Sequence, residues 1–152
     1  MRVLLDTNII IHRESDLILN RDIGTLFRWL DRIRAIKLIH QITISEIKSY
    51  KNNSKLAAFL TKMDSYEQMK TVAPLSREVI DLCKGVDVNQ NDKNDTQLLN
   101  EVFCGRVDLL VTEDKKMHRK ADLLNISDKV FSIDSFLERM YSEFPDFVEY
   151  KV

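Results

Sequence analysis

The chain lacks the features that mark membrane, secreted and zinc-thiolate proteins. It has two cysteines, Cys83 and Cys104, which form no Cys-x-x-Cys pair and no zinc-ligand spacing with any of the three histidines. No apolar run approaches the ~20 residues that a membrane span needs. The N-terminus carries one arginine before an apolar segment and shows no secretory cleavage pattern. These absences predict a cytoplasmic protein with two reduced core cysteines and no membrane partner.

An excess of charge of one sign is also lacking. The formal net charge is −1 at pH 7, which argues against a protein that coats nucleic acid non-specifically. A nuclease remains compatible, because a local basic patch can guide phosphates while catalytic acids cancel it in the total. The 152 residues are 44% apolar and 31% charged, which predicts one domain with a real core over residues 1–152. The apolar-aromatic ending, FVEYKV, favours a fragment of a longer protein.

Apolar segments of strand length alternate with amphipathic segments of helix length. The strongest strand pattern is VDLLVT at residues 107–112, and a clear helix pattern covers residues 21–34. This alternation indicates an α/β fold with a parallel sheet. The expected strands are residues 3–5, 37–40, 71–72, 107–112 and 129–133. The expected helices are residues 21–34, 43–50, 54–68, 76–84, 95–104, 115–124 and 134–141.

Four acidic residues lie where the chain leaves an expected strand or enters an expected helix. They are Asp6, Glu46, Asp95 and Asp114. In an open parallel sheet the carboxyl ends of the strands meet at one edge, where ligands bind. Carboxylates gathered there repel each other, and Mg²⁺ or Mn²⁺ would remove that repulsion. Such ions can orient a water for in-line phosphoryl displacement, so the pattern predicts metal-dependent cleavage of phosphodiester bonds.

Each acid taken singly has a structural alternative, because acids favour helix N-termini. Glu46 fits a capping box opened by Thr43. Asp92 and Asp95 fit the N-cap and third position of one helix, and Asp114 fits the N-cap of another. The metal-site hypothesis therefore rests on the placement of all four acids together and not on any single acid.

Of the four acids, Asp6 is the one that a helix-capping role explains least well. It directly follows a buried-strand pattern and precedes the apolar run at residues 9–11. Burying a lone carboxylate there costs several kcal/mol unless it is paired or metal-bound. Asn8 and Thr112 are polar neighbours of the acids that could orient an acid or a metal-bound water. Thr7 or Asn8 could instead cap the first helix.

Basic residues follow two of the four acids closely in the chain. They are Lys48, Lys51, Lys115, Lys116 and Arg119. A solvated helix face explains either group. If the metal-site hypothesis holds, the same residues could grip the backbone of a nucleic acid.

Four segments, in this order, resemble the four acidic motifs of the PIN domain: MRVLLDTNIII, ITISEIKSY, NDKNDTQLL and LLVTEDKKM. The resemblance covers nearly the whole chain. It implies a three-layer α/β/α sandwich with a mostly parallel central sheet, and a Mg²⁺- or Mn²⁺-dependent ribonuclease that acts on single-stranded RNA. By motif, the implied metal-binding acids are Asp6, Glu46, Asp95 and Asp114, supported by Asn8 and Thr112.

The chain departs from this pattern at two places. Glu113 stands beside Asp114, and Asp92 lies near Asp95, so the motifs leave open which acid of each pair binds metal. Many members of the family are toxins held by a small antitoxin. However, RDIGTLFRWLDRI and FVEYKV resemble bacterial proteins in which a PIN domain precedes an acetyltransferase domain. A homodimer is a further arrangement left open.

Two other classes of function fit the sequence less well. A phosphatase with Asp6 as covalent nucleophile would show Asp-x-Asp, but the second position is Asn8. A non-catalytic RNA-binding or regulatory domain of the same fold would be expected to lose acids, and this chain keeps all four.

Overall fold

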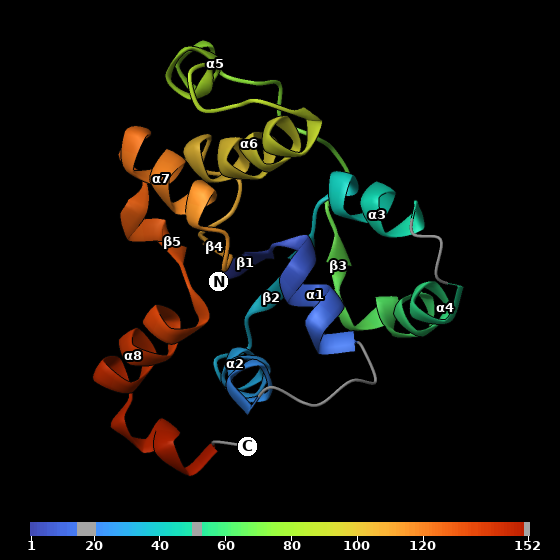
Figure 1. The fold of residues 1–152 in the computed structure, drawn as a ribbon. Helices are drawn as coiled ribbons and strands as arrows, with labels where there is room; N and C mark the ends of the chain where they lie inside the picture. Colours follow the sequence, from blue (N-terminus) through green and yellow to red (C-terminus); the bar gives the residue numbers. More distant parts are fainter. Residues whose placement is uncertain (15–20, 50–52, 151–152) are drawn as a thin grey trace.

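Five short strands form the centre of the computed structural model, which describes residues 1–14, 21–49 and 53–150 (Figure 1). They pair in parallel throughout, in the order β3-β2-β1-β4-β5. The strands are β1 (Arg2–Leu5), β2 (Ile36–Ile39), β3 (Glu67–Gln68), β4 (Leu109–Val111) and β5 (Val130–Phe131). The predicted α/β class and parallel sheet are confirmed. The third strand, expected at residues 71–72, forms at 67–68 instead.

Helices connect and cover the strands. Within the described residues they are α1 (Thr7–Glu14), α2 (Arg21–Arg32), α3 (Gln41–Lys48), α4 (Asn53–Lys62), α5 (Arg77–Cys83), α6 (Gln90–Phe103), α7 (Lys115–Leu123) and α8 (Ile133–Glu143). Short 3-10 turns follow at Met63–Ser65, Ser127–Lys129 and Pro145–Tyr150. Figure 1 shows α6 and α7 on one side of the sheet and α2 and α8 on the other.

The alternation of side chains along β1 creates two cores. Val3 and Leu5 pack into one cluster with apolar residues of α1, α2 and α8, whereas Leu4 packs into the other with residues of α5, α6 and α7. Successive side chains of a strand point to opposite faces of the sheet. Each fully buried Val or Leu stabilises the fold by about 1.5–3 kcal/mol. A four-residue strand that is apolar on both faces can therefore anchor both helical layers.

Several helix boundaries differ from the expectation because their caps are formed by other residues. Helix α3 begins at Gln41 with His40 as its N-cap, not at Thr43. Helix α6 begins at Gln90, because Asn89 is its N-cap and Asp92, its third residue, completes the capping box. The helix expected at 54–68 ends at Lys62 and is followed by a 3-10 turn.

The two cysteines differ in exposure, and the C-terminal aromatic segment packs against α2. Cys83 is buried, but Cys104 is exposed, so the prediction of two core cysteines is wrong for Cys104. In the last turn Phe147 packs edge-on against Trp29, with ring centroids 5.4 Å apart, and this contact covers α2. No helix among the described residues combines the length and the apolarity needed to cross a bilayer.

Candidate active site

The order of the strands opens a crevice beside β1. From β1 the chain adds β2 and β3 on one side and β4 and β5 on the other, so the strand order reverses next to β1. Ligands of open α/β sheets bind outside the carboxyl ends of the strands at such a point. Here β1 leads into Asp6 and β4 leads into Thr112, and the Asp6 amide donates to the Val111 carbonyl at 3.1 Å.

A cavity of about 320 Å³ lies at this edge of the sheet. Its lining includes all four acids singled out from the sequence: Asp6, Glu46, Asp95 and Asp114. The other lining residues are Thr7, Asn8, Ser49 and Asn91. The four carboxylates come from four different parts of the chain, namely the exit of β1, α3, α6 and the start of α7.

Asp6 is held from both sides of its carboxylate. The side chain is buried, and Oδ1 accepts a hydrogen bond from the Thr7 amide at 2.7 Å while Oδ2 accepts one from the Thr112 hydroxyl at 2.8 Å. Burial raises the pKa of Asp6, and the charge of Asp114 adds to that rise, while the two hydrogen bonds oppose it. The Asp6 carboxylate is thus held in place by hydrogen bonds, but they do not fully offset the cost of burying its negative charge.

Asp114 both caps a helix and lines the cavity. Its Oδ1 accepts hydrogen bonds from the amides of Lys116 at 2.8 Å and Met117 at 3.3 Å, so it is the N-cap of α7. Its own amide donates to the Thr112 hydroxyl at 3.1 Å. The capping alternative is therefore correct for Asp114 and does not exclude a role in the site, because the side chain also faces the cavity.

Glu46 and Asp95 are not helix caps. Each is the sixth residue of its helix, counted from Gln41 in α3 and Gln90 in α6. The capping-box alternative for Glu46 is therefore wrong. Burial raises the pKa of Glu46, and the charge of Asp6 adds to the rise.

The pKa of Asp95 is raised far above its ordinary value. Burial, followed by the charges of Asp6 and Asp114, raises its pKa to about 7, although Lys120 acts in the opposite direction. Among the described residues, none of the four carboxylates forms an ion pair with Lys or Arg. Acids in one cavity whose pKa values are raised by burial and by one another form a candidate functional site.

Asp92 and Asp95 have different surroundings in the structure. Asp92 Oδ2 accepts from the Val88 amide at 2.9 Å and from the Lys116 ammonium at 2.8 Å. The hydrogen bond from Lys116 is the main reason that the pKa of Asp92 is lowered to about 2. Asp92 thus completes a cap and an ion pair, whereas Asp95 faces the cavity.

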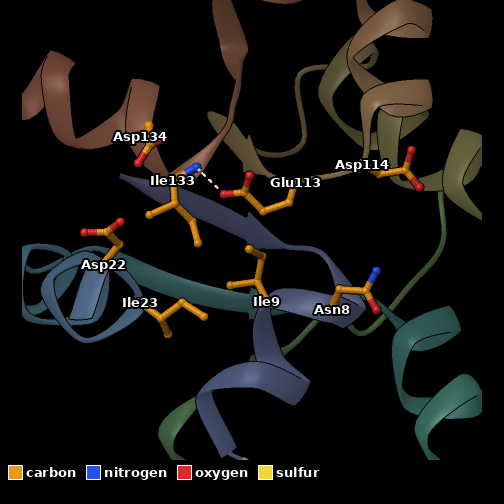
Figure 2. A pocket seen from close by; sticks show the side chains of 8 residues that line it. All are labelled: Asn8, Ile9, Asp22, Ile23, Glu113, Asp114, Ile133 and Asp134. Atoms are coloured by element: carbon orange, nitrogen blue, oxygen red, sulfur yellow. Dashed lines mark hydrogen bonds between the residues drawn. The ribbon is translucent and has the colours of Figure 1, made fainter. Parts of the chain in front are cut away.

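Glu113 and Asp114 also differ in their hydrogen-bond partners. Glu113 Oε1 accepts a hydrogen bond from the Ile133 amide at 2.8 Å, at the start of α8. Figure 2 shows the Glu113 side chain pointing toward Ile133, whereas the Asp114 side chain points the opposite way. Both residues line a second pocket, of about 440 Å³. That pocket shares Asn8 and Asp114 with the first and is lined further by Ile9, Asp22, Ile23, Glu113, Ile133 and Asp134.

The donor set suits a hard divalent cation, because it consists of carboxylate, hydroxyl and amide oxygens. Over residues 1–14, 21–49 and 53–150, no three Asp, Glu, His or Cys side chains meet closely enough to hold an ion directly. Mg²⁺ is usually bound by one or two carboxylates and retains several waters. The cavity therefore fits a hydrated ion shared among the acids rather than a closed protein cage.

The predicted basic residues have different surroundings. Lys48, Lys115 and Arg119 are exposed. Lys116 forms the ion pair with Asp92, and Lys51 lies outside the described residues. Their contact with nucleic acid stays a prediction.

The sequence motifs did not predict two of the lining residues, Ser49 and Asn91. Ser49 follows Glu46 by three positions, and Asn91 precedes Asp95 by four. Residues three and four apart share one face of a helix, so this spacing was the available signal.

Comparison with known proteins supports the fold. Neither a protein-family model nor a curated protein matches the sequence. One solved structure with a similar fold is that of VapBC2 from Rickettsia felis bound to a DNA fragment from their promoter. The alignment covers 87% of this chain and 98% of that chain, with a TM-score of 0.59 and 17% sequence identity. At this identity the similarity concerns the fold alone, and it agrees with a PIN-like sandwich.

Proposed function

We propose that the chain is a Mg²⁺- or Mn²⁺-dependent endoribonuclease that hydrolyses phosphodiester bonds of single-stranded RNA. The main support is the shared cavity, in which four carboxylates from distant parts of the chain gather without an ion pair among the described residues. Such an arrangement destabilises the fold in the absence of a cation, because like charges in a partly buried site repel. A catalytic use of the acids accounts for that cost.

The proposed roles follow from the contacts of each residue. Asp6, Glu46, Asp95 and Asp114 would hold the divalent cation, which when bound supplies an activated water and neutralises charge on the phosphate. Thr112 orients Asp6 and Asp114 through its hydroxyl. Asn8 is exposed at the boundary between the two pockets, where its amide can donate a hydrogen bond to a phosphate oxygen.

Substrate would approach across the basic residues that follow Glu46 and Asp114 in the chain. Lys48, Lys115 and Arg119 are exposed and would contact phosphates rather than bases, which gives affinity without sequence preference.

A second candidate function is that of a toxin controlled by a small partner protein. The observation that favours it is the likeness in fold to the VapBC2 structure, which contains a complex rather than a single protein. Co-purification of the tagged chain with the product of a neighbouring reading frame tests this candidate. The expectation of a C-terminal acetyltransferase domain has no support beyond the sequence resemblance and stays a prediction.

Cleavage of an end-labelled single-stranded RNA by the purified protein tests the nuclease. We expect cleavage with Mg²⁺ or Mn²⁺, none with EDTA, and a loss of more than about 100-fold in Asp6→Asn and Asp114→Asn, because even indirect partners of metal ligands cost 10–100-fold. Asp128→Asn changes an exposed acid outside the cavity and should retain full activity. Undiminished cleavage by Asp6→Asn, or cleavage in EDTA, would exclude the proposed mechanism.

A further inference from the structure

His40 joins the helix that carries Glu46 to the rest of the site. It follows β2, its side chain is fully buried, and its Nδ1 accepts a hydrogen bond from the Ile42 amide at 3.0 Å as the N-cap of α3. Ser, Thr, Asp and Asn are the usual N-cap residues, and any of them would satisfy this amide with a shorter side chain. Histidine differs from them in having a second ring nitrogen, which points to a second contact.

That second contact is with Glu101 in α6. The Ile42 amide can only donate, so Nδ1 carries no proton and the proton of the neutral ring lies on Nε2. Nε2 therefore donates to Glu101 Oε1, at 3.1 Å. The tautomer of His40 is fixed by the helix cap at one nitrogen and by a carboxylate at the other.

Glu101 is held as a carboxylate at this buried position. Its side chain has no exposed surface, and it also accepts from the Ala73 amide at 2.9 Å and lies 3.0 Å from the Arg106 guanidinium. Burial alone would raise the pKa of Glu101, but the hydrogen bonds from His40 and Ala73 and the charge of Arg106 outweigh it and lower the pKa. Glu101 is thus a fixed anchor on α6.

The link connects two helices that each carry an acid of the cavity. Helix α6 carries Asp95, and α3 carries Glu46. A second buried contact, from the Thr7 hydroxyl to the Thr43 hydroxyl at 3.0 Å, ties α3 to the exit of β1 beside Asp6. The His40–Glu101 contact therefore fixes the start of α3 relative to α6, and with it the position of Glu46 in the cavity.

We propose that His40, anchored by Glu101, is a positioning residue for Glu46. It contacts neither substrate nor cation, and it acts by holding the first turn of α3 against α6. The inference rests on the proposed function, because the consequence of a displaced Glu46 is weaker divalent-cation binding and slower RNA cleavage. Residues that orient metal ligands in this way typically change affinity or activity by about 10–100-fold.

Two variants test the link, and a neighbouring residue supplies the control. His40→Asn keeps a good N-cap but is too short to reach Glu101, while Ala73 and Arg106 remain as partners of Glu101. Glu101→Gln retains the shape of the side chain, but it replaces the charged acceptor of the His40 bond with a weaker neutral one and turns an amide group toward the Arg106 guanidinium. Asn100→Ala is the control, since Asn100 is equally buried on α6 and bonds the 73–76 loop through Pro74 and Ser76.

Three measurements are made on each protein: thermal stability, Mn²⁺ binding by calorimetry without RNA, and kcat and KM for RNA cleavage. We expect all three variants to lose stability. Only His40→Asn and Glu101→Gln should weaken Mn²⁺ binding and lower kcat by about 10- to 100-fold with little change in KM. In a Glu46→Gln background, His40→Asn should add no further loss of Mn²⁺ affinity, because residues acting through one group are not additive.

The outcomes separate this inference from the proposed function. A wild-type protein that neither binds Mn²⁺ nor cleaves RNA would overturn both. A normal wild type in which His40→Asn and Glu101→Gln behave like Asn100→Ala, or in which the His40 and Glu46 effects add, would overturn the positioning role alone. If His40→Asn does not fold, the Glu101→Gln comparison decides the question.

Discussion

The Thr112 hydroxyl bridges Asp6 and Asp114 across the neighbouring exits of β1 and β4. It donates to Asp6 Oδ2 at 2.8 Å and accepts from the Asp114 amide at 3.1 Å, in a fully buried position. One side chain thereby sets the orientation of one acid and the backbone of another. This makes Thr112 the supporting residue with the most direct structural connection to the site.

Thr112→Val is expected to damage both stability and activity. Valine has nearly the same shape but can neither donate to Asp6 nor accept from the Asp114 amide. Leaving such buried groups without a partner costs about 1–3 kcal/mol in the free energy of unfolding, which denaturant titration measures. RNA cleavage should fall by about 10–100-fold. Thr112→Ser retains the hydroxyl and should keep most of the activity. An inactive serine variant of normal stability would show that the hydroxyl is not what matters.

Asp95 should make the metal-free protein less stable as the pH rises. Its pKa is about 7 in the folded protein, against an ordinary value of about 3.9 in an unfolded chain. Between these two values the folded protein binds more protons than the unfolded chain, so the free energy of unfolding falls with increasing pH. Thermal unfolding in EDTA across this window measures the slope.

Asp95→Asn should flatten that slope and raise the stability at neutral pH, because it removes a charge that repels Asp6 and Asp114. Mn²⁺ should stabilise the wild type more as the pH rises through about 7, because the bound ion needs ionised ligands. Asp128→Asn is the matched control and should leave the slope as it is. A wild-type slope of the opposite sign would contradict the proposed charge balance.

Lys115 and Lys116 should differ in their effects on RNA binding. Lys115 is exposed, while Lys116 is paired with Asp92 at 2.8 Å. Lys115→Ala is expected to weaken binding about equally for all RNA sequences and to reduce the salt slope by about 0.7, the value for one phosphate contact with a single strand. Lys116→Ala should change the slope less, because its charge is already used by Asp92. RNA binding measured across a salt series checks both variants. Equal slopes in the wild type, Lys115→Ala and Lys116→Ala would show that Lys115 is only part of a solvated helix face.

Lys120 should contribute far more to stability than an exposed ion-paired residue. Its side chain is fully buried, 2.6 Å from Asp87 Oδ1, and it also donates to the Asp92 carbonyl and the Thr96 hydroxyl. Lys120→Met leaves the Asp87 carboxylate without its cationic partner, and breaking a buried pair in this way costs roughly 3–5 kcal/mol. Arg77→Met breaks the exposed pair with Asp81 and should cost less than about 1 kcal/mol. Chemical denaturation of the two variants gives the comparison.

Part of this structure follows from local sequence patterns. The apolar residues Val3, Leu4 and Leu5 are buried on both faces of the sheet, as a short continuous apolar run predicts. The alternation of such runs with amphipathic segments predicted the parallel α/β sheet, and acids at the exits of strands and in the following helices predicted which side chains would line one cavity. These features depend on the period and order of residues, which are visible in the chain itself.

Other features depend on contacts that no local pattern records. The third strand, Glu67–Gln68, is a two-residue exposed edge strand with no apolar period, so only its pairing with β2 defines it. Asp92 and Asp95 are equivalent by composition, and the ion pair from Lys116, 24 residues away, leaves Asp95 as the one that faces the cavity. Likewise His40 became the cap of α3 with a partner 61 residues further along the chain. The sequence determined which acids reach the carboxyl edge of the sheet, and tertiary contacts decided how each is held, because burial and charge pairing are set by neighbours distant in sequence.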